Sequence, residues 1–70
     1  MEYIELNTFI KLKNLAPTGG QAKLLIRSEK VLVNGTLETR NKKKLIDGDI
    51  VECSGQKFVI KLSDYDKSQE

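Results

Sequence analysis

The 70-residue sequence has no histidine, no tryptophan and one cysteine, Cys53. A single cysteine cannot form an internal disulfide, and without histidine the chain lacks the usual ligands of a zinc site. Cys53 has no histidine to act as its base, so we interpret it as a small buried strand residue rather than a nucleophile. We therefore expect no metal, no cofactor and no enzymatic activity.

The chain also lacks a long apolar run. No stretch is long enough to span a bilayer, and the acidic N-terminus, Met1–Glu5, has neither the basic start nor the apolar stretch of an export signal. We expect a cytoplasmic protein with no membrane partner. A chain of this size forms one domain that buries only roughly 60% of its unfolded surface. That leaves no room for a deep pocket or a small-molecule substrate.

Positive charge is concentrated in the middle of the chain. Residues 11–44 hold nine Lys or Arg and two Glu, a net charge of +7, whereas the two ends together hold three Lys and eight Asp or Glu, a net charge of −5. A fold that brings the middle onto one face would present a basic patch to a polyanion. Taken alone, such a charge run is as often an ordinary solvated surface.

The first part of the chain predicts a short strand and a helix. Residues 3–6 alternate weakly and favour a strand, and residues 9–15 favour a helix with Asn7 or Thr8 as its N-cap. Pro17 ends this helix because proline disfavours helical geometry at the residue before it.

A second helix is predicted to begin near Gly19, where Thr18 can accept hydrogen bonds from the free N–H groups of the first turn. Its apolar residues recur at i, i+3 and i+4, and its basic residues at i, i+4 and i+7 on another face. Most basic stripes of this kind are solvated outer faces. The apolar stripe is Ala22, Leu25 and Ile26, and the basic stripe is Lys23, Arg27 and Lys30.

The second half predicts a small sheet. Asn34-Gly35 lies between two β-prone runs, residues 31–33 and 36–39, and is a strong hairpin signal because both residues tolerate positive φ. Residues 40–44 form a basic loop that we expect to protrude from the sheet.

Two more strands are predicted, at residues 50–53 and 57–62, with turns at residues 47–49 and at Gly55. In the last strand Phe58, Ile60 and Leu62 share one face. For Phe9 and Phe58 we favour core packing over base stacking, since the small core needs both rings. Residues 63–70 are polar and predict a frayed tail, so the domain should cover residues 1–62.

Four pieces of the sequence together resemble the S4, or alpha-L, RNA-binding domain. The combination is specific, whereas each piece alone is weak, and the resemblance spans about residues 5–53. Thr-Gly-Gly-Gln-Ala-Lys, followed later by Glu38-Thr39-Arg40, is closer to the small stand-alone members than to domains attached to enzymes. The four pieces are Leu15-Ala-Pro-Thr-Gly-Gly-Gln-Ala-Lys-Leu-Leu-Ile26, Val31-Leu-Val-Asn-Gly35, Lys44-Leu45 and Gly48-Asp-Ile-Val51.

The resemblance implies an α+β fold in which two short helices pack on a small, mostly antiparallel sheet. It also implies one positively charged surface that grips structured RNA, with a helix side and a loop side. Lys30 and Lys44 extend this surface by their charge, and Lys11 and Lys13 are weaker candidates. The resemblance implies Thr18, Gln21, Lys23 and Arg27 on the helix side, and Arg40, Lys42 and Lys43 on the loop side.

The sequence departs from the family pattern at three places. Gly19-Gly20 stands where Ser-Arg is common, so a backbone N–H contact would replace a guanidinium contact. Glu5 stands where many members have Arg, which weakens an RNA role for the first helix. Glu29 stands where a glycine commonly closes the second helix, so we expect a different helix ending there, because positive φ would carry a steric cost.

These observations predict a non-catalytic protein that binds structured RNA. The resemblance to stand-alone members implies ribosomal RNA and a role in large-subunit assembly. A-form RNA hides its base edges in a narrow groove, so a small module with few aromatics is suited to reading shape and backbone. The alternative is a protein-interaction module that docks an acidic partner surface, although lysine is usually depleted at interface centres.

Overall fold

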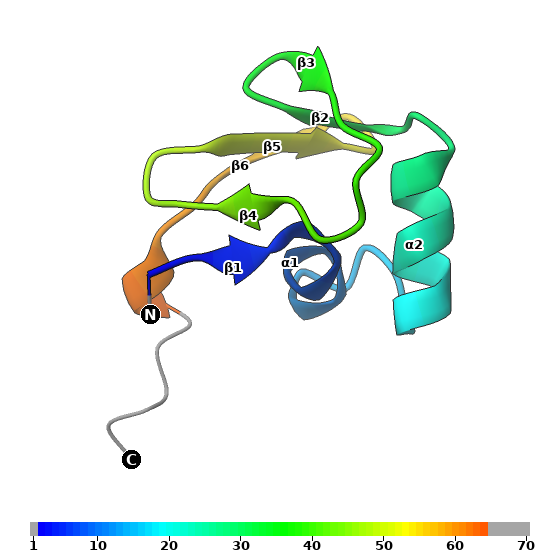
Figure 1. Ribbon diagram of the computed structural model, residues 1–70, viewed down its shortest axis with the longest axis horizontal. Helices are drawn as coiled ribbons and strands as arrows, with labels where there is room; N and C mark the ends of the chain where they lie inside the picture. The colour runs from blue at the N-terminus through cyan, green and yellow to red at the C-terminus, as the bar shows by residue number, and fades with distance from the viewer. Residues whose placement is uncertain (1, 65–70) are drawn as a thin grey trace.

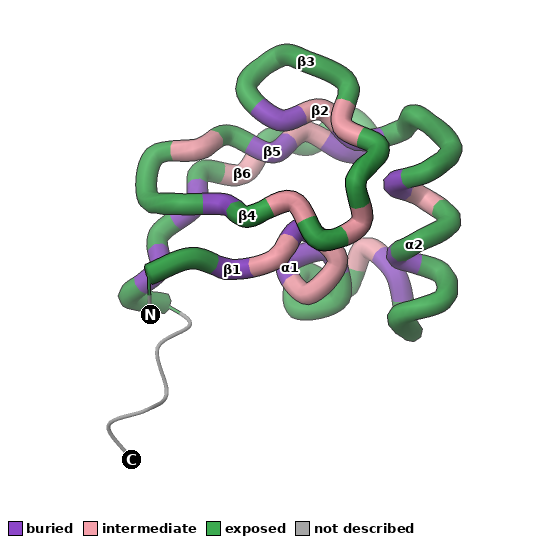
Figure 2. Tube along the Cα trace, viewed as in Figure 1, coloured by how far each residue is buried: buried purple, intermediate pink, exposed green. Residues whose placement is uncertain are grey.

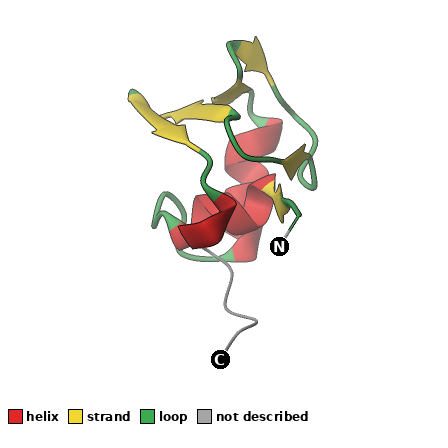
Figure 3. Cartoon of the chain, turned by 90° about the vertical axis from the view of Figure 1, so that its left-hand side faces the viewer, coloured by secondary structure: helices red, strands yellow, loops and turns green. Residues whose placement is uncertain are grey.

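The computed structural model describes residues 2–64, which form two short α-helices, six short strands and a 3₁₀ helix (Figure 1). The helices lie together beneath the larger group of strands in the turned view of Figure 3. In chain order the elements are β1 (Ile4–Glu5), α1 (Leu6–Leu12), α2 (Gly19–Arg27), β2 (Val31–Val33), β3 (Thr36–Leu37), β4 (Lys44–Leu45), β5 (Ile50–Cys53), β6 (Gln56–Val59) and η1 (Leu62–Asp64).

The strands form two antiparallel sheets. The larger has the order β3-β2-β5-β6, and β1 pairs with β4 in the smaller. In the larger sheet Val33 lies opposite Val51, and Ile50 lies opposite Val59. The predicted α+β class, with two helices on a mostly antiparallel sheet, is confirmed.

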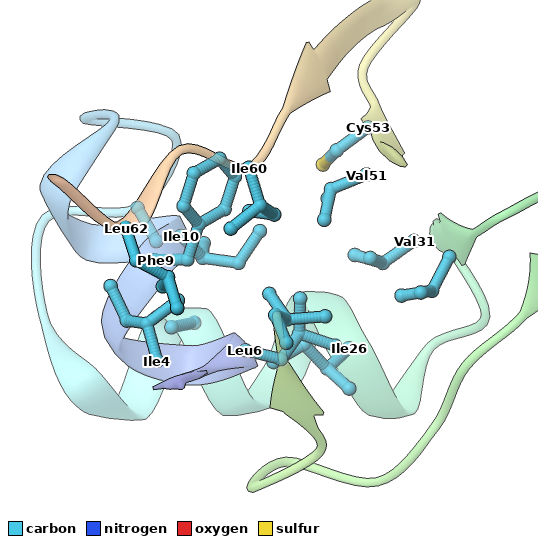
Figure 4. Packing of buried hydrophobic residues seen from close by; sticks show 14 residues of the cluster. Ile4, Leu6, Phe9, Ile10, Ile26, Val31, Val51, Cys53, Ile60 and Leu62 are labelled. Atoms are coloured by element: carbon cyan, nitrogen blue, oxygen red, sulfur yellow. The ribbon is translucent and has the colours of Figure 1, made fainter. Parts of the chain in front are cut away.

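One hydrophobic core joins the helices to the inner face of the larger sheet (Figure 4). Phe9 is fully buried, and its ring meets that of Phe58 edge-on, with centroids 5.8 Å apart and an interplanar angle of 74°. Both rings serve the core, as predicted, and Cys53 is buried with them. The buried residues are Ile4, Leu6, Phe9, Ile10, Ala16, Ala22, Ile26, Val31, Val33, Leu45, Val51, Cys53, Ile60 and Leu62.

Helix α1 begins three residues earlier than the sequence predicts. Neither Asn7 nor Thr8 caps it, and the N-cap Glu5 makes no side-chain capping bond. The N–H groups of Leu6 and Asn7 instead donate to the backbone carbonyls of Lys43 and Asn41, at 2.8 and 3.0 Å. A distant loop therefore satisfies two of the free donors of this helix end, in place of a local side-chain cap.

Helix α2 begins as predicted, since Thr18 is its N-cap and its Oγ1 accepts the N–H of Gln21 at 3.2 Å. It ends at Arg27, so Lys30 lies beyond the helix. The prediction that Lys30 belongs to the basic stripe of this helix was therefore wrong.

The prediction that α2 would end without a positive φ at Glu29 was also wrong, because Glu29 adopts a positive φ of 63°. Its N–H donates to the carbonyl of Ile26, and the N–H of Lys30 donates to that of Leu25. This is the Schellman pattern, whose two hydrogen bonds offset a steric cost of roughly 1 kcal/mol for a side chain in the left-handed region.

The hairpin turn is confirmed, with positive φ at both Asn34 and Gly35. Strand β6 is shorter than predicted and stops at Val59. Beyond it the chain bonds to the turn at residues 47–49, where Asp47 Oδ1 accepts the N–H of Leu62 at 2.6 Å. Ser63 and Asp64 belong to η1. The rest of the predicted tail, residues 65–70, lies outside the described residues, and the domain boundary at 62 stays a prediction.

Candidate nucleic-acid interface

The outward side of α2 carries the helix part of the predicted site. Burial of Ala22 and Ile26 fixes the rotation of the helix and leaves the opposite side exposed, together with Leu24, which is 62% exposed (Figure 2). The exposed predicted residues are Thr18, Gln21, Lys23 and Arg27, with Lys30 just beyond the helix.

The two glycines that open α2 are not required by the packing of the protein. A Cβ atom on Gly19 would meet nothing within 4 Å, and one on Gly20 would meet only Thr18 Oγ1, at 3.9 Å. Glycine lowers the stability of a helix relative to alanine, so these two residues do not serve the helix itself. Because they lack a Cβ atom, the backbone at the start of α2 is open to close approach from outside.

The basic loop, residues 40–44, does not protrude as predicted but lies against the start of α1. The cause is the pair of hydrogen bonds from Leu6 and Asn7 to its carbonyls. The side-chain Oδ1 atoms of Asn7 and Asn41 are buried there without a partner among the described residues. The loop surrounds an open hollow of about 430 Å³ lined by Arg40, Lys42, Lys43 and Lys44.

The antiparallel pairing of β2 with β3 brings the segment that follows α2 beside the segment that precedes this loop. The N–H of Glu38 donates to the carbonyl of Val31 at 3.0 Å. Val31 directly follows Lys30, and Glu38 lies two residues before Arg40. In Figure 1 the loop passes between β4 and α2. We call the exposed side of residues 18–30 and the loop 40–44 the basic surface.

Two acidic residues lie in or next to the basic surface, Glu29 after α2 and Glu38 before the loop, and no separate role for Glu38 was predicted from the sequence. Glu38 Oε2 accepts hydrogen bonds from Nε of Arg40 at 2.8 Å and from its backbone N–H at 3.1 Å. The side chain of Glu38 is only 12% exposed, whereas that of Arg40 is 72% exposed. The hydrogen bond to Arg40 lowers the pKa of Glu38, and the same bond raises the pKa of Arg40.

Two of the sequence motifs serve the fold. The Asn34 side chain donates to Asp49 Oδ1 at 3.1 Å and accepts the N–H of Ile50 at 2.9 Å. Asp49 Oδ2 accepts the N–H of Ile46 at 2.9 Å. The Asn-Gly and Gly-Asp pieces therefore hold the hairpin turn against the turn at residues 47–49, and they explain the sheet rather than a binding site.

Comparison with known families matches the sequence to a described domain. The model of the S4 domain family covers residues 1–61. The chain belongs to the S4 domain family. The resemblance noted in the sequence is thereby confirmed.

Two relatives of this S4 domain have informative names. One is the "Probable ribosome maturation protein RlbA" of Bacillus subtilis, 41% identical over 54 residues, which are 77% of this chain and 76% of the relative. Another is the "Putative RNA-binding protein YbcJ" of Escherichia coli, 36% identical over 58 residues, which are 83% of each chain. Within residues 2–64 of the S4 domain, no helix is both long and apolar enough to cross a bilayer.

The remaining predicted lysines, Lys11, Lys13 and Lys44, lie outside α2. Lys13 follows the end of α1 opposite to the end that touches the loop, and its Nζ lies 5.8 and 5.6 Å from the ring centroids of Phe9 and Phe58. Lys11 is exposed in the last turn of α1. Lys44 Nζ lies 4.9 Å from the ring centroid of Tyr3. In this S4 domain the cations closest in sequence to the link between Val31 and Glu38 are Lys30 and Arg40.

Proposed function

We propose that this S4 domain is a non-catalytic RNA-binding protein that contacts structured RNA with its basic surface. The observation that carries the proposal is the pairing of β2 with β3, which places Val31, the residue after Lys30, beside Glu38, two residues before a loop lined by four cations. Lysine and arginine on two rigid segments can neutralise several phosphates of an RNA helix at once and release their counterions.

The contacts available to this surface favour the RNA backbone over the bases. Lys23, Arg27 and Lys42 are exposed donors that suit phosphate oxygens, and the bare backbone of Gly19-Gly20 leaves the N–H groups at the start of α2 accessible. Phe9 and Phe58 do not offer their rings to bases, because both pack in the core. Binding of this kind positions the protein by the shape and charge of the RNA.

We further propose that the partner is ribosomal RNA and that the protein acts in assembly of the large ribosomal subunit. The name of the Bacillus subtilis relative, a ribosome maturation protein, supports the ribosomal part of this proposal. The large-subunit part rests on the resemblance to stand-alone members. The cytoplasmic location expected from the sequence stays a prediction.

The proposal is tested by measuring binding to ribosomal RNA fragments over a salt series. We expect the Lys23→Glu/Arg27→Glu variant to bind at least about tenfold more weakly and to show a smaller salt dependence, because two phosphate contacts are lost. The matched control is Lys57→Glu/Lys61→Glu, which makes the same charge change at exposed positions in and after β6.

Equal weakening by the two variants would show that only net charge matters. Binding that ignores both salt and the variants would contradict the proposal. Retention of ribosomal proteins by the immobilised chain after nuclease treatment would favour the docking of an acidic protein instead.

A further inference from the structure

Glu38 is unexpected on a surface that binds a polyanion. Residues 11–44 contain only two acidic residues, and Glu38 is the one whose side chain is held against the protein, at 12% exposure. A carboxylate near the path of the RNA repels phosphate, so by charge alone its removal should strengthen binding. Its contact with Arg40 can offset this repulsion.

The geometry of the pair formed by Glu38 and Arg40 supplies an effect that offsets the repulsion. Glu38 Oε2 accepts from Arg40 Nε at 2.8 Å, and Oε1 lies 3.4 Å from Arg40 Nη2. The carboxylate thus occupies the side edge of the guanidinium. The end edge, formed by Nη1 and the remaining hydrogen of Nη2, faces away from Glu38 on a side chain that is 72% exposed. That edge is the fork that matches two phosphate oxygens.

We propose that Glu38 is a positioning residue that holds the guanidinium of Arg40 with its end edge ready for a phosphate of the bound RNA. This inference rests on the proposed RNA-binding function and adds to it a residue that does not itself touch the RNA.

The benefit is pre-organisation. A free arginine side chain loses rotamer freedom when it binds a phosphate, and this loss weakens binding. Arg40 has already lost part of that freedom in the unbound protein, because its guanidinium is bonded to Glu38, whose carboxylate is itself held by the backbone N–H of Arg40. The carboxylate remains ionised at neutral pH, since the same hydrogen bonds lower the pKa of Glu38.

The test is a double-mutant cycle between Glu38→Ala and Arg40→Ala, read as affinity for an A-form RNA duplex at fixed salt. We expect Glu38→Ala to weaken binding by about three- to tenfold, although it makes the protein more positive. In the Arg40→Ala background the same change should no longer weaken binding and should strengthen it slightly, since only the repulsion is then removed.

A second variant guards against a folding defect in Glu38→Ala. Arg40→Lys leaves Glu38 and the net charge in place but lacks the planar fork, so it should also weaken binding several-fold. Thermal unfolding of each variant without RNA gives the folded fraction at the temperature of the binding experiment.

Three results would overturn the inference. Glu38→Ala could bind as tightly as the wild type or more tightly, which is the result that charge alone predicts. It could weaken binding equally in the Arg40→Ala background, which would assign its effect to the shape of the loop through the backbone N–H of residue 40. Arg40→Lys could bind like the wild type. Failure of the proposed function would appear as a wild-type protein that binds no RNA. Failure of this inference alone would appear as a wild type that binds RNA together with one of the three results above.

Discussion

The turn at residues 47–49 and the basic surface use their charged side chains in opposite ways. Asp47 and Asp49 bond to backbone N–H groups of Leu62 and Ile46, and Asp49 also bonds to the side chain of Asn34. Within residues 2–64, by contrast, Lys23 and Lys42 make no ion pair or side-chain hydrogen bond. The carboxylates hold the fold together, whereas these cations are available to a partner.

This comparison separates residues that serve stability from residues that serve binding. A change in the turn should alter the free energy of unfolding without changing the salt dependence of RNA binding. A change in the basic surface should do the reverse. The predictions below test this separation in order of decreasing expected effect.

The largest effect is expected for Asp49→Ala, which should lower the free energy of unfolding by about 2 kcal/mol, because it leaves the N–H of Ile46 and the amide of Asn34 without their acceptor. Urea unfolding measures the change. Asp64→Ala is the matched control, since it removes the same charge from an exposed residue of η1. A loss no larger than that of the control would mean that the turn is not held by these bonds.

Two glycine substitutions should have opposite effects on stability, and only the one in the basic surface should also alter RNA binding. Gly35 has a φ of 82°, so Gly35→Ala should destabilise the protein by roughly 1 kcal/mol. Gly20 is helical with open space around it, so Gly20→Ala should stabilise the protein by up to about 1 kcal/mol and yet weaken RNA binding. Thermal unfolding and binding assays measure both effects. Unchanged RNA affinity in Gly20→Ala would remove the start of α2 from the interface.

The lysines offer a finer comparison. Lys42→Ala should reduce the slope of log affinity against log salt by about one, as expected for one lost phosphate contact. Lys13→Ala should leave that slope unchanged, because Lys13 lies over Phe9 and Phe58 at the far end of α1. The reverse pattern would move the interface toward the end of α1.

The smallest effect concerns acid pH. The folded-state pKa of Glu38 lies below its unfolded value because Arg40 bonds to its ionised form. Its contribution to stability is therefore complete above the unfolded pKa and is lost as the pH falls through the folded pKa. Side-chain NMR titration should show the pKa of Glu38 rising in Arg40→Ala. An unchanged pKa in that variant would mean that the pair does not form in solution.

The parts of the fold that follow from neighbouring residues could be predicted from the sequence. Asn34-Gly35 specifies a turn because both positions need positive φ, and Thr18 can cap α2 from three residues away. The start of α1 could not be predicted, because its donors are satisfied by carbonyls of residues 41 and 43, far along the chain. Glu29 shows a related limit, since two hydrogen bonds outweigh the preference for glycine.

The candidate site divides in the same manner. The cations of α2 follow from the buried stripe of Ala22 and Ile26, which determines the side that faces outward. The contact of the loop with α1 is a tertiary arrangement that local sequence patterns do not encode, whereas the pairing of Glu38 with Arg40 is local and joins residues two positions apart. A glutamate two residues before an arginine, just after a strand, is the one signal that could have drawn attention to the pair.

The central claim is that α2 and the loop 40–44 form one RNA-binding surface, and amide NMR shifts during titration with a short RNA duplex test it most directly. The account predicts that residues 18–30 and 38–44 shift together at the same RNA concentration, while residues 46–50 and 54–57 stay in place. Shifts centred on β5 and β6, or shifts of α2 without the loop, would contradict it.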